Sequence, residues 1–163
     1  MTDVFLRLGA RFSHCRRYRY RLWRTWDDRK PPIVYIMLNP SNADDQQDDA
    51  TITRCIRRAE CLGAGGIIVM NLFSFVSTKP HDLYHVEDPV GPDTDAELLD
   101  ACRGALHVIC GWGNHGRYRQ RDIQLLSLLR ANGIQPKALH INGDGSPKHP
   151  LYVGYHRPLI DLP

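Results

Sequence analysis

The sequence predicts an α/β fold, a three-layer α/β/α sandwich around a four-stranded parallel core sheet with an added N-terminal edge strand. Four short apolar runs each stop at turn residues, and stretches of helical periodicity separate them. A continuous apolar run bounded by turn residues is typical of a strand buried on both faces, as in a parallel sheet. The alternation of strands and helices favours right-handed crossovers within one domain over residues 1–163.

Composition is that of an ordinary globular protein, with 42% hydrophobic and 24% charged residues among 163. No apolar run approaches the roughly 20 residues of a membrane span, and the N-terminus has no secretory signal pattern. The five cysteines include no Cys-x-x-Cys pair, which favours reduced thiols over a structural zinc or disulfide framework. We therefore expect a cytoplasmic protein with no membrane partner, no metal and no cofactor.

Charge is unevenly distributed along the chain, although the net charge is only +3. Residues 11–24 contain six arginines and no acid, whereas residues 44–49 contain four acids and no base. The basic segment is compatible with a phosphate-bearing partner. Charge alone leaves open the alternative that this segment is a solvated edge strand.

The first strand predicted by alternation covers residues 18–26, where tyrosines and Leu22 alternate with arginines. We expect it at a sheet edge, where arginines on the solvent side discourage aggregation. The segment Lys30-Pro31-Pro32 then breaks the chain. The first buried strand follows and runs into Leu38-Asn39-Pro40-Ser41, where Pro40 ends it.

A helix over residues 50–62 is indicated by Ile52 and Ile56 at helical spacing, with Asp48 or Asp49 as its cap. The remaining predicted strands cover residues 67–70, 106–110 and 138–141, and further helices start at Thr94 and cover residues 118–131. Residues 72–90 form a long irregular segment, and segments of that length are usually functional or mobile.

Polar and aromatic residues follow each buried strand, and the carboxyl ends of parallel strands meet at one edge of the sheet. These residues are Asn39-Pro40-Ser41, Asn71-Leu72-Phe73, Gly111-Trp112-Gly113-Asn114 and the loop of residues 142–150 with His149. Amides, an indole and an imidazole with few charges suit a planar, neutral ligand such as a nucleobase. The alternative for each asparagine is ordinary turn chemistry.

These motifs resemble a known family. Leu38-Asn39-Pro40-Ser41 and Ser146-Pro147-Lys148-His149-Pro150 are similar to the Asn-Pro and His-Pro loops of mismatch-specific members of the uracil-DNA glycosylase superfamily. Cys110-Gly111-Trp112-Gly113 resembles the Leu-Trp-Gly stretch before a late helix, and the order and spacing fit over residues 33–150. The whole chain also resembles a family of uncharacterised bacterial and phage proteins with the same two signatures.

The resemblance implies a role for each matching residue. Asn39 would orient the attacking water, and His149 would donate a hydrogen bond to the leaving base. The expected base-binding residues are Pro40, Ser41, Asn71, Phe73, Trp112 and Asn114. The expected nucleic-acid-binding residues are Arg117, Arg119 and Lys148. Arg121 and the basic stretch of residues 16–24 are expected to make further phosphate contacts.

The sequence departs from the superfamily in its first loop, in the acidic stretch after Ser41 and in its cysteines. The strongest uracil enzymes carry an aspartate where this chain has Asn39, so Asp44, Asp48 or Asp49 is a candidate substitute, the alternative for each being a helix cap. Leu151 or Tyr152 would be the residue that wedges into the duplex. The cysteines do not match the iron–sulfur members, so we expect no cluster.

The leading hypothesis is therefore hydrolysis of an N-glycosidic bond to a modified or mismatched base in nucleic acid, with DNA favoured over RNA, or in a nucleoside. The alternative is a non-catalytic module that recognises a modified base in the same pocket. A third hypothesis, a hydrolase with Ser41 or Ser146 as nucleophile, requires a histidine paired with that serine. His115 is a further candidate at the pocket edge.

Overall fold

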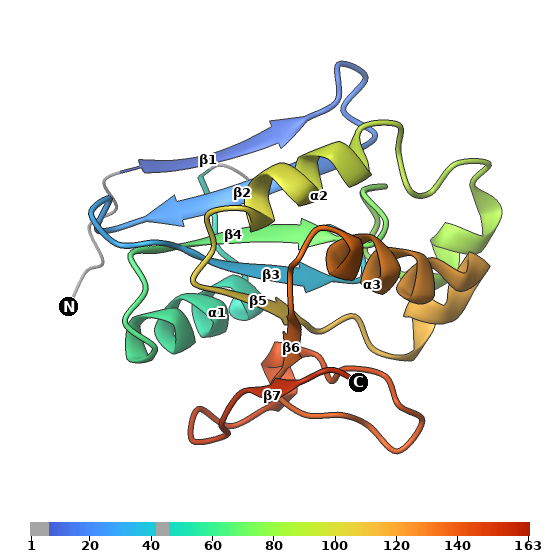
Figure 1. The fold of residues 1–163 in the computed structure, drawn as a ribbon. Helices are drawn as coiled ribbons and strands as arrows, with labels where there is room; N and C mark the ends of the chain where they lie inside the picture. Colours follow the sequence, from blue (N-terminus) through green and yellow to red (C-terminus); the bar gives the residue numbers. More distant parts are fainter. Residues whose placement is uncertain (1–6, 42–45) are drawn as a thin grey trace.

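The computed structural model describes residues 7–41 and 46–163 (Figure 1). The strands are β1 (Arg7–Phe12), β2 (Arg19–Thr25), β3 (Ile33–Met37), β4 (Gly66–Asn71), β5 (His107–Cys110), β6 (Pro136–Ala138) and β7 (Ile160–Asp161). The α-helices are α1 (Ala50–Cys61), α2 (Thr94–Cys102) and α3 (Arg121–Ala131), and the short 3₁₀ helices are η1 (Pro80–His85), η2 (Asn114–Gln120) and η3 (Pro150–Tyr152).

The strands form one mixed sheet in the order β1-β2-β4-β3-β5-β6-β7. Strand β3 pairs in parallel with β4 and β5, and β5 pairs in parallel with β6. The pairs β1–β2, β2–β4 and β6–β7 are antiparallel. The predicted α/β class is confirmed, and the sheet is larger and more mixed than the sequence indicated.

Three elements differ from their predicted positions. Strand β2 lies inside the sheet and not at its edge, because β1 covers its outer side. The last parallel strand begins at Pro136, and β7 pairs with it where the sequence indicated only a packed tail. The last helix begins at Arg121, because Arg119 and Gln120 have left-handed φ values of 56° and 55° that a continuous α-helix does not allow.

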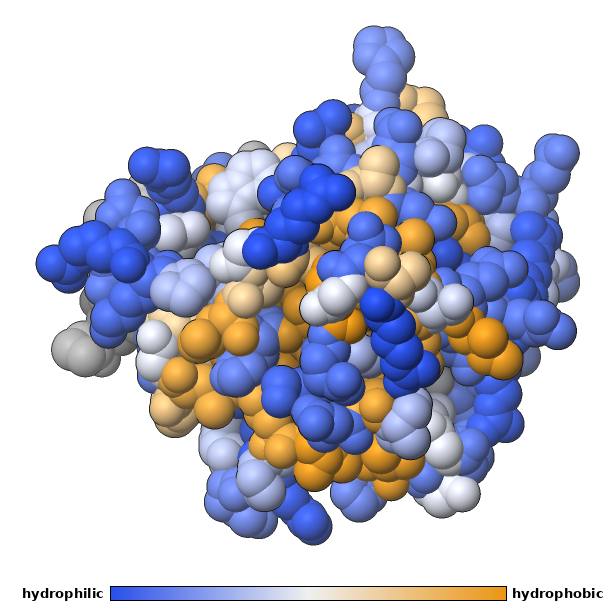
Figure 2. Space-filling view, in the orientation of Figure 1, coloured by the Kyte–Doolittle hydropathy of each residue, from blue (hydrophilic) through white to orange (hydrophobic). Residues whose placement is uncertain are grey.

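Helices cover both faces of the sheet, with α1 on one face and α2 and α3 on the other (Figure 1). On the face carrying α2 and α3, hydrophilic side chains alternate with smaller groups of hydrophobic ones (Figure 2). In the residues that the structure describes, no helix has the length and apolar character that crossing a membrane requires.

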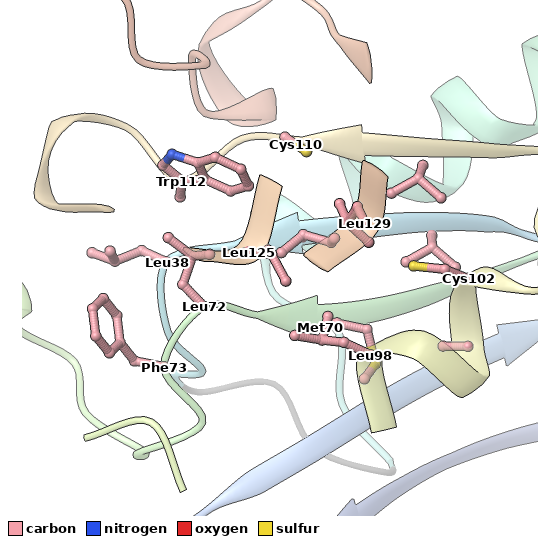
Figure 3. Packing of buried hydrophobic residues seen from close by; sticks show 14 of the residues in the cluster. Leu38, Met70, Leu72, Phe73, Leu98, Cys102, Cys110, Trp112, Leu125 and Leu129 are labelled. Atoms are coloured by element: carbon pink, nitrogen blue, oxygen red, sulfur yellow. The ribbon is translucent and has the colours of Figure 1, made fainter. Parts of the chain in front are cut away.

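The two faces have separate apolar cores. Helix α1 packs Ile52 and Ile56 against Tyr35 of β3, whose hydroxyl donates to the Cys55 carbonyl at 3.0 Å. On the other face Leu98 of α2 and Leu125 and Leu129 of α3 cover Met70 and Cys110 of the sheet (Figure 3). Burying a leucine or isoleucine stabilises the fold by about 1.5–3 kcal/mol. These cores hold the strand ends in fixed positions.

Candidate functional site

A cavity of about 660 Å³ opens at the carboxyl ends of β3, β4 and β5. Its walls come from these strand ends, from β2, from the start of α1, from residues 77–80, and from η2 and η3. The lining residues are Arg19, Met37, Leu38, Asn39, Ser41, Asp49, Thr51, Ile52, Asn71, Ser77, Thr78, Pro80, Trp112, Asn114, His115, His149, Leu151 and Tyr152. Ligand sites of open parallel sheets occur at this edge.

The structure brings together most residues that the sequence assigned to a site. Those that line the cavity are Asn39, Ser41, Asn71, Trp112, Asn114 and His149, together with His115. Pro40 is buried and is not part of the cavity wall. Phe73 is also absent from the wall, because its side chain packs into the apolar core (Figure 3). Its ring lies 5.9 Å from that of Tyr118.

Asn39 is held in one orientation by backbone carbonyls. Its Nδ2 donates to the Ser77 oxygen at 2.9 Å and to the Pro40 oxygen at 3.2 Å, and it lies 3.5 Å from the Phe75 oxygen. Carbonyl oxygens only accept hydrogen bonds, so the amide nitrogen must face them. Oδ1 is then the end of this side chain that can accept a hydrogen bond from water or from a ligand.

His149 is the N-cap of η3, and its Nδ1 accepts a hydrogen bond from the Leu151 amide at 3.2 Å. A neutral imidazole that accepts at Nδ1 carries its proton on Nε2. Burial lowers the pKa of His149 below its usual value, and the charge of nearby Asp49 partly opposes that decrease. The cavity therefore contains a neutral imidazole whose Nε2–H group is a hydrogen-bond donor.

Asp49 is the carboxylate of the cavity. Its Oδ1 accepts from the Ile52 amide at 2.8 Å and caps α1, which confirms one of the two caps that the sequence allowed. Asp48 instead pairs with Arg24 at 2.8 Å and is not part of the cavity wall. Asp44 lies outside the described residues. Asp49 is therefore both a helix cap and a cavity residue.

Asn71, the last residue of β4, has a buried amide with an unpaired donor. The side chain is 2% exposed, and Nδ2 has no hydrogen-bond partner among the described residues. A buried polar group without a partner destabilises a protein by about 1–3 kcal/mol. Such groups call for an explanation, and an acceptor on a bound ligand is one.

The sequence interpretation did not assign several lining residues to the site, and Arg19 and Ser77 are the two whose polar groups matter most there. Arg19 is 3% exposed and lines the cavity, whereas the edge-strand assignment had placed it in solvent. Ser77 supplies both a wall of the cavity and the carbonyl that orients Asn39. The length of the segment over residues 72–90 was the available signal for Ser77. No local pattern marked Arg19, because its burial depends on the position of β2 inside the sheet.

The arginines expected to bind nucleic acid are engaged within the protein. Arg117 pairs with Asp144 at 3.2 Å, and Arg119 donates to the Glu87 oxygen at 2.9 Å. Arg121 is buried and bonded to the Leu72 oxygen and to Asp95, so it is a structural residue. In the basic stretch, Arg24 is 1% exposed and paired, and Arg21 pairs with Glu97 and Asp100. Lys148 is half-buried and lies outside the cavity wall.

A serine or cysteine nucleophile finds little support. Ser146 donates to Asp144 at 2.6 Å, and in residues 7–41 and 46–163 no serine hydroxyl bonds to His149. Burial raises the pKa of the Cys102 thiol to about 12 and raises that of Cys55 and Cys110 further, which keeps these thiols protonated. The same part of the chain contains no group of three or more His, Cys, Asp or Glu side chains placed to hold a metal ion.

The α/β fold thus has a polar cavity at the carboxyl edge of its sheet, lined by a fixed amide, a neutral imidazole and a carboxylate. The chain belongs to a family described as a protein of unknown function (DUF1643), whose model matches residues 19–151. This span includes every lining residue except Tyr152. No curated protein and no solved structure matches the chain.

Proposed function

We propose that this protein hydrolyses the N-glycosidic bond of a modified or mismatched nucleobase in nucleic acid, with DNA as the favoured substrate. The observation that carries the proposal is the Nε2–H donor of neutral His149 in the same cavity as the acceptor Oδ1 of Asn39. The parallel run β4-β3-β5-β6 supports the glycosylase-like α/β/α fold that the motifs imply.

The reaction would proceed in the following way. Water adds to the sugar carbon as the bond from that carbon to the base nitrogen breaks, and the bonding electrons move onto the base. Asn39 Oδ1 orients the water, and Asp49 accepts its proton. His149 stabilises the negative charge that develops on the base, and one well-placed donor of this kind contributes roughly 3–4 kcal/mol to the barrier reduction.

In this proposal Asn71 and Trp112 contact the base. The unpaired Nδ2 of Asn71 would donate to an acceptor on the edge of the base. The Trp112 indole would form one flat wall of the cavity. Tyr152 is 70% exposed at the cavity edge beside His149, whereas Leu151 is half-buried, so Tyr152 is the better candidate for a wedge residue.

The proposal is tested by base release from single- and double-stranded oligonucleotides carrying uracil, hypoxanthine, mismatched thymine or bulky modified pyrimidines. We expect His149→Ala to reduce the single-turnover rate by about 10²–10³-fold, because the stabilising donor is lost. Asn39→Ala should also reduce it. His85→Ala is a matched control, since His85 is exposed and does not line the cavity. No release from any substrate, or full activity of His149→Ala, would contradict the proposal.

A second function, recognition of a modified base without cleavage, is favoured by one observation. An amide oxygen at Asn39 cannot take up the proton of the attacking water, and Asp49, the cavity carboxylate that could, already accepts the Ile52 amide as the cap of α1. Tight binding of one modified base that Asn71→Ala abolishes, with no base release by the native protein, would support this second function. Asn132→Ala is its control, because Asn132 lies at the exposed end of α3.

A further inference from the structure

A second, smaller hollow lies beside the cavity, among the C-terminal segments that Figure 1 colours orange to red. Its volume is about 160 Å³. Its lining includes the basic side chains of His140, Lys148, His156 and Arg157, and none of the residues that line it is acidic. A concave site lined by cations and free of carboxylates attracts anions.

The basic side chains of this hollow are not neutralised by the protein. Within residues 7–41 and 46–163, the side chains of Lys148 and Arg157 make no hydrogen bond and no ion pair. The same is true of the rings of His140 and His156. Lys148 is half-buried, so its charge is partly withdrawn from water without a counter-ion from the chain. These charges are available to a ligand.

The wall of the hollow is held in place by two further arginines. Arg58 of α1 is 2% exposed and donates to the Val153 oxygen at 2.7 Å and to the Gly154 oxygen at 3.2 Å. Arg54 donates to the same Val153 oxygen at 3.0 Å. These guanidiniums fix the backbone of residues 153–154 and add positive charge behind it. The hollow is therefore a rigid, electropositive site.

Tyr152 connects the hollow with the cavity, because it lines both. An anion in the hollow would lie on one side of Tyr152 while a base in the cavity lies on the other. A free nucleobase or nucleoside has no anionic group to place in the hollow. A polynucleotide carries a phosphodiester next to every base.

We propose that the hollow binds a backbone phosphodiester of a polynucleotide, next to the nucleotide whose base enters the cavity. This inference rests on the proposed function and selects a nucleic acid over a free nucleoside as the substrate. Lys148 and Arg157 donate to the phosphate oxygens, and His140 and His156 supply further ring N–H donors. The contact is independent of base sequence.

The test compares two double variants with the same change in charge. Lys148→Gln with Arg157→Gln alters the hollow, whereas Lys30→Gln with Arg103→Gln alters the opposite edge, before β3 and β5. Binding of a fluorescent oligonucleotide without modified bases is followed by anisotropy across a salt series. We expect the hollow variant to bind about tenfold more weakly at low salt and to lose about one unit of salt slope per contact, and the control to retain native affinity and slope.

The outcomes separate this inference from the proposed function. Equal weakening in both double variants, or native affinity in the hollow variant, would overturn the phosphodiester site, whether or not the native protein releases bases. Inorganic phosphate that saturates the hollow while no oligonucleotide binds the native protein would also overturn it. Oligonucleotide binding that depends on the hollow, without release of any base, would support the site and remove the glycosylase proposal.

Discussion

Two buried arginines of this protein are paired with acidic side chains, whereas the basic side chains of the hollow are not paired within residues 7–41 and 46–163. Arg24 and Arg121 are buried and bonded to Asp48 and Asp95. His149 is half-buried without such a bond in the described part of the chain, and its pKa is lowered by desolvation. The Lys148 and Arg157 side chains of the basic hollow have no acidic partner in the described residues. Burial of an unpaired charge is costly, so a buried base either pairs or loses its proton. A run of arginines in a sequence is therefore weak support for a nucleic-acid interface.

Replacement of Arg24 should have the largest effect on stability. Arg24→Met removes a buried guanidinium that donates to Asp48 at 2.8 Å and to the Trp23 oxygen at 2.9 Å, so both of these hydrogen bonds are lost. We expect the free energy of unfolding to fall by about 3 kcal/mol, measured by urea denaturation. Arg29→Met is the control, because Arg29 is 86% exposed. Equal midpoints for the two variants would remove the distinction between buried and accessible basic groups.

Local signals were sufficient for the elements that carry their own pattern. The spacing of Ile52 and Ile56 and the cap at Asp49 are properties of one segment, so the sequence alone identified α1. Strand β1 was not predicted, because residues 1–15 show only a weak pattern. In the fold, a Cβ atom at Gly9 would lie 2.4 Å from the Trp23 ring, so the strand requires glycine there.

The site residues that could be predicted from the sequence are those that lie at or after the ends of the parallel strands. Asn39, Asn71 and Trp112 each end or follow a strand, and parallel pairing brings them to one cavity. Phe73 was misplaced because the direction of a side chain two residues beyond a strand depends on the loop backbone. Arg19 was missed because its burial requires β1, which the sequence did not reveal.

The dependence of stability on pH tests whether desolvation lowers the pKa of His149. Since burial lowers the pKa of His149 in the folded state, the unfolded chain binds a proton first as the pH falls through about 6.5. Stability from this group is therefore present above that pH and lost below it. We expect the free energy of unfolding of the native protein to decline more steeply between pH 7 and 5 than that of His149→Asn. The difference between the two slopes should be less than about 1.4 kcal/mol per pH unit, the limit for one titrating group.

Urea denaturation at a series of pH values measures this slope. His156→Asn provides the control, because His156 is exposed in the basic hollow and not in the cavity. Identical slopes for the native protein and His149→Asn would mean that folding does not lower the pKa of His149. A native stability that rises as the pH falls, relative to His149→Asn, would mean that the folded state holds His149 protonated, and it would contradict the neutral donor on which the catalytic proposal depends.

The smallest effect on stability is expected from the basic hollow itself. Lys148→Gln and Arg157→Gln remove charges that pair with no described acid, so each should change the free energy of unfolding by no more than about 0.5 kcal/mol. Removing like charges that repel one another gives a change toward greater stability. Urea denaturation at low salt measures this change, and high salt should reduce it by screening. A loss comparable to that of Arg24→Met would show that these side chains support the fold, as the buried arginines do, and that their charge is not held available for a ligand.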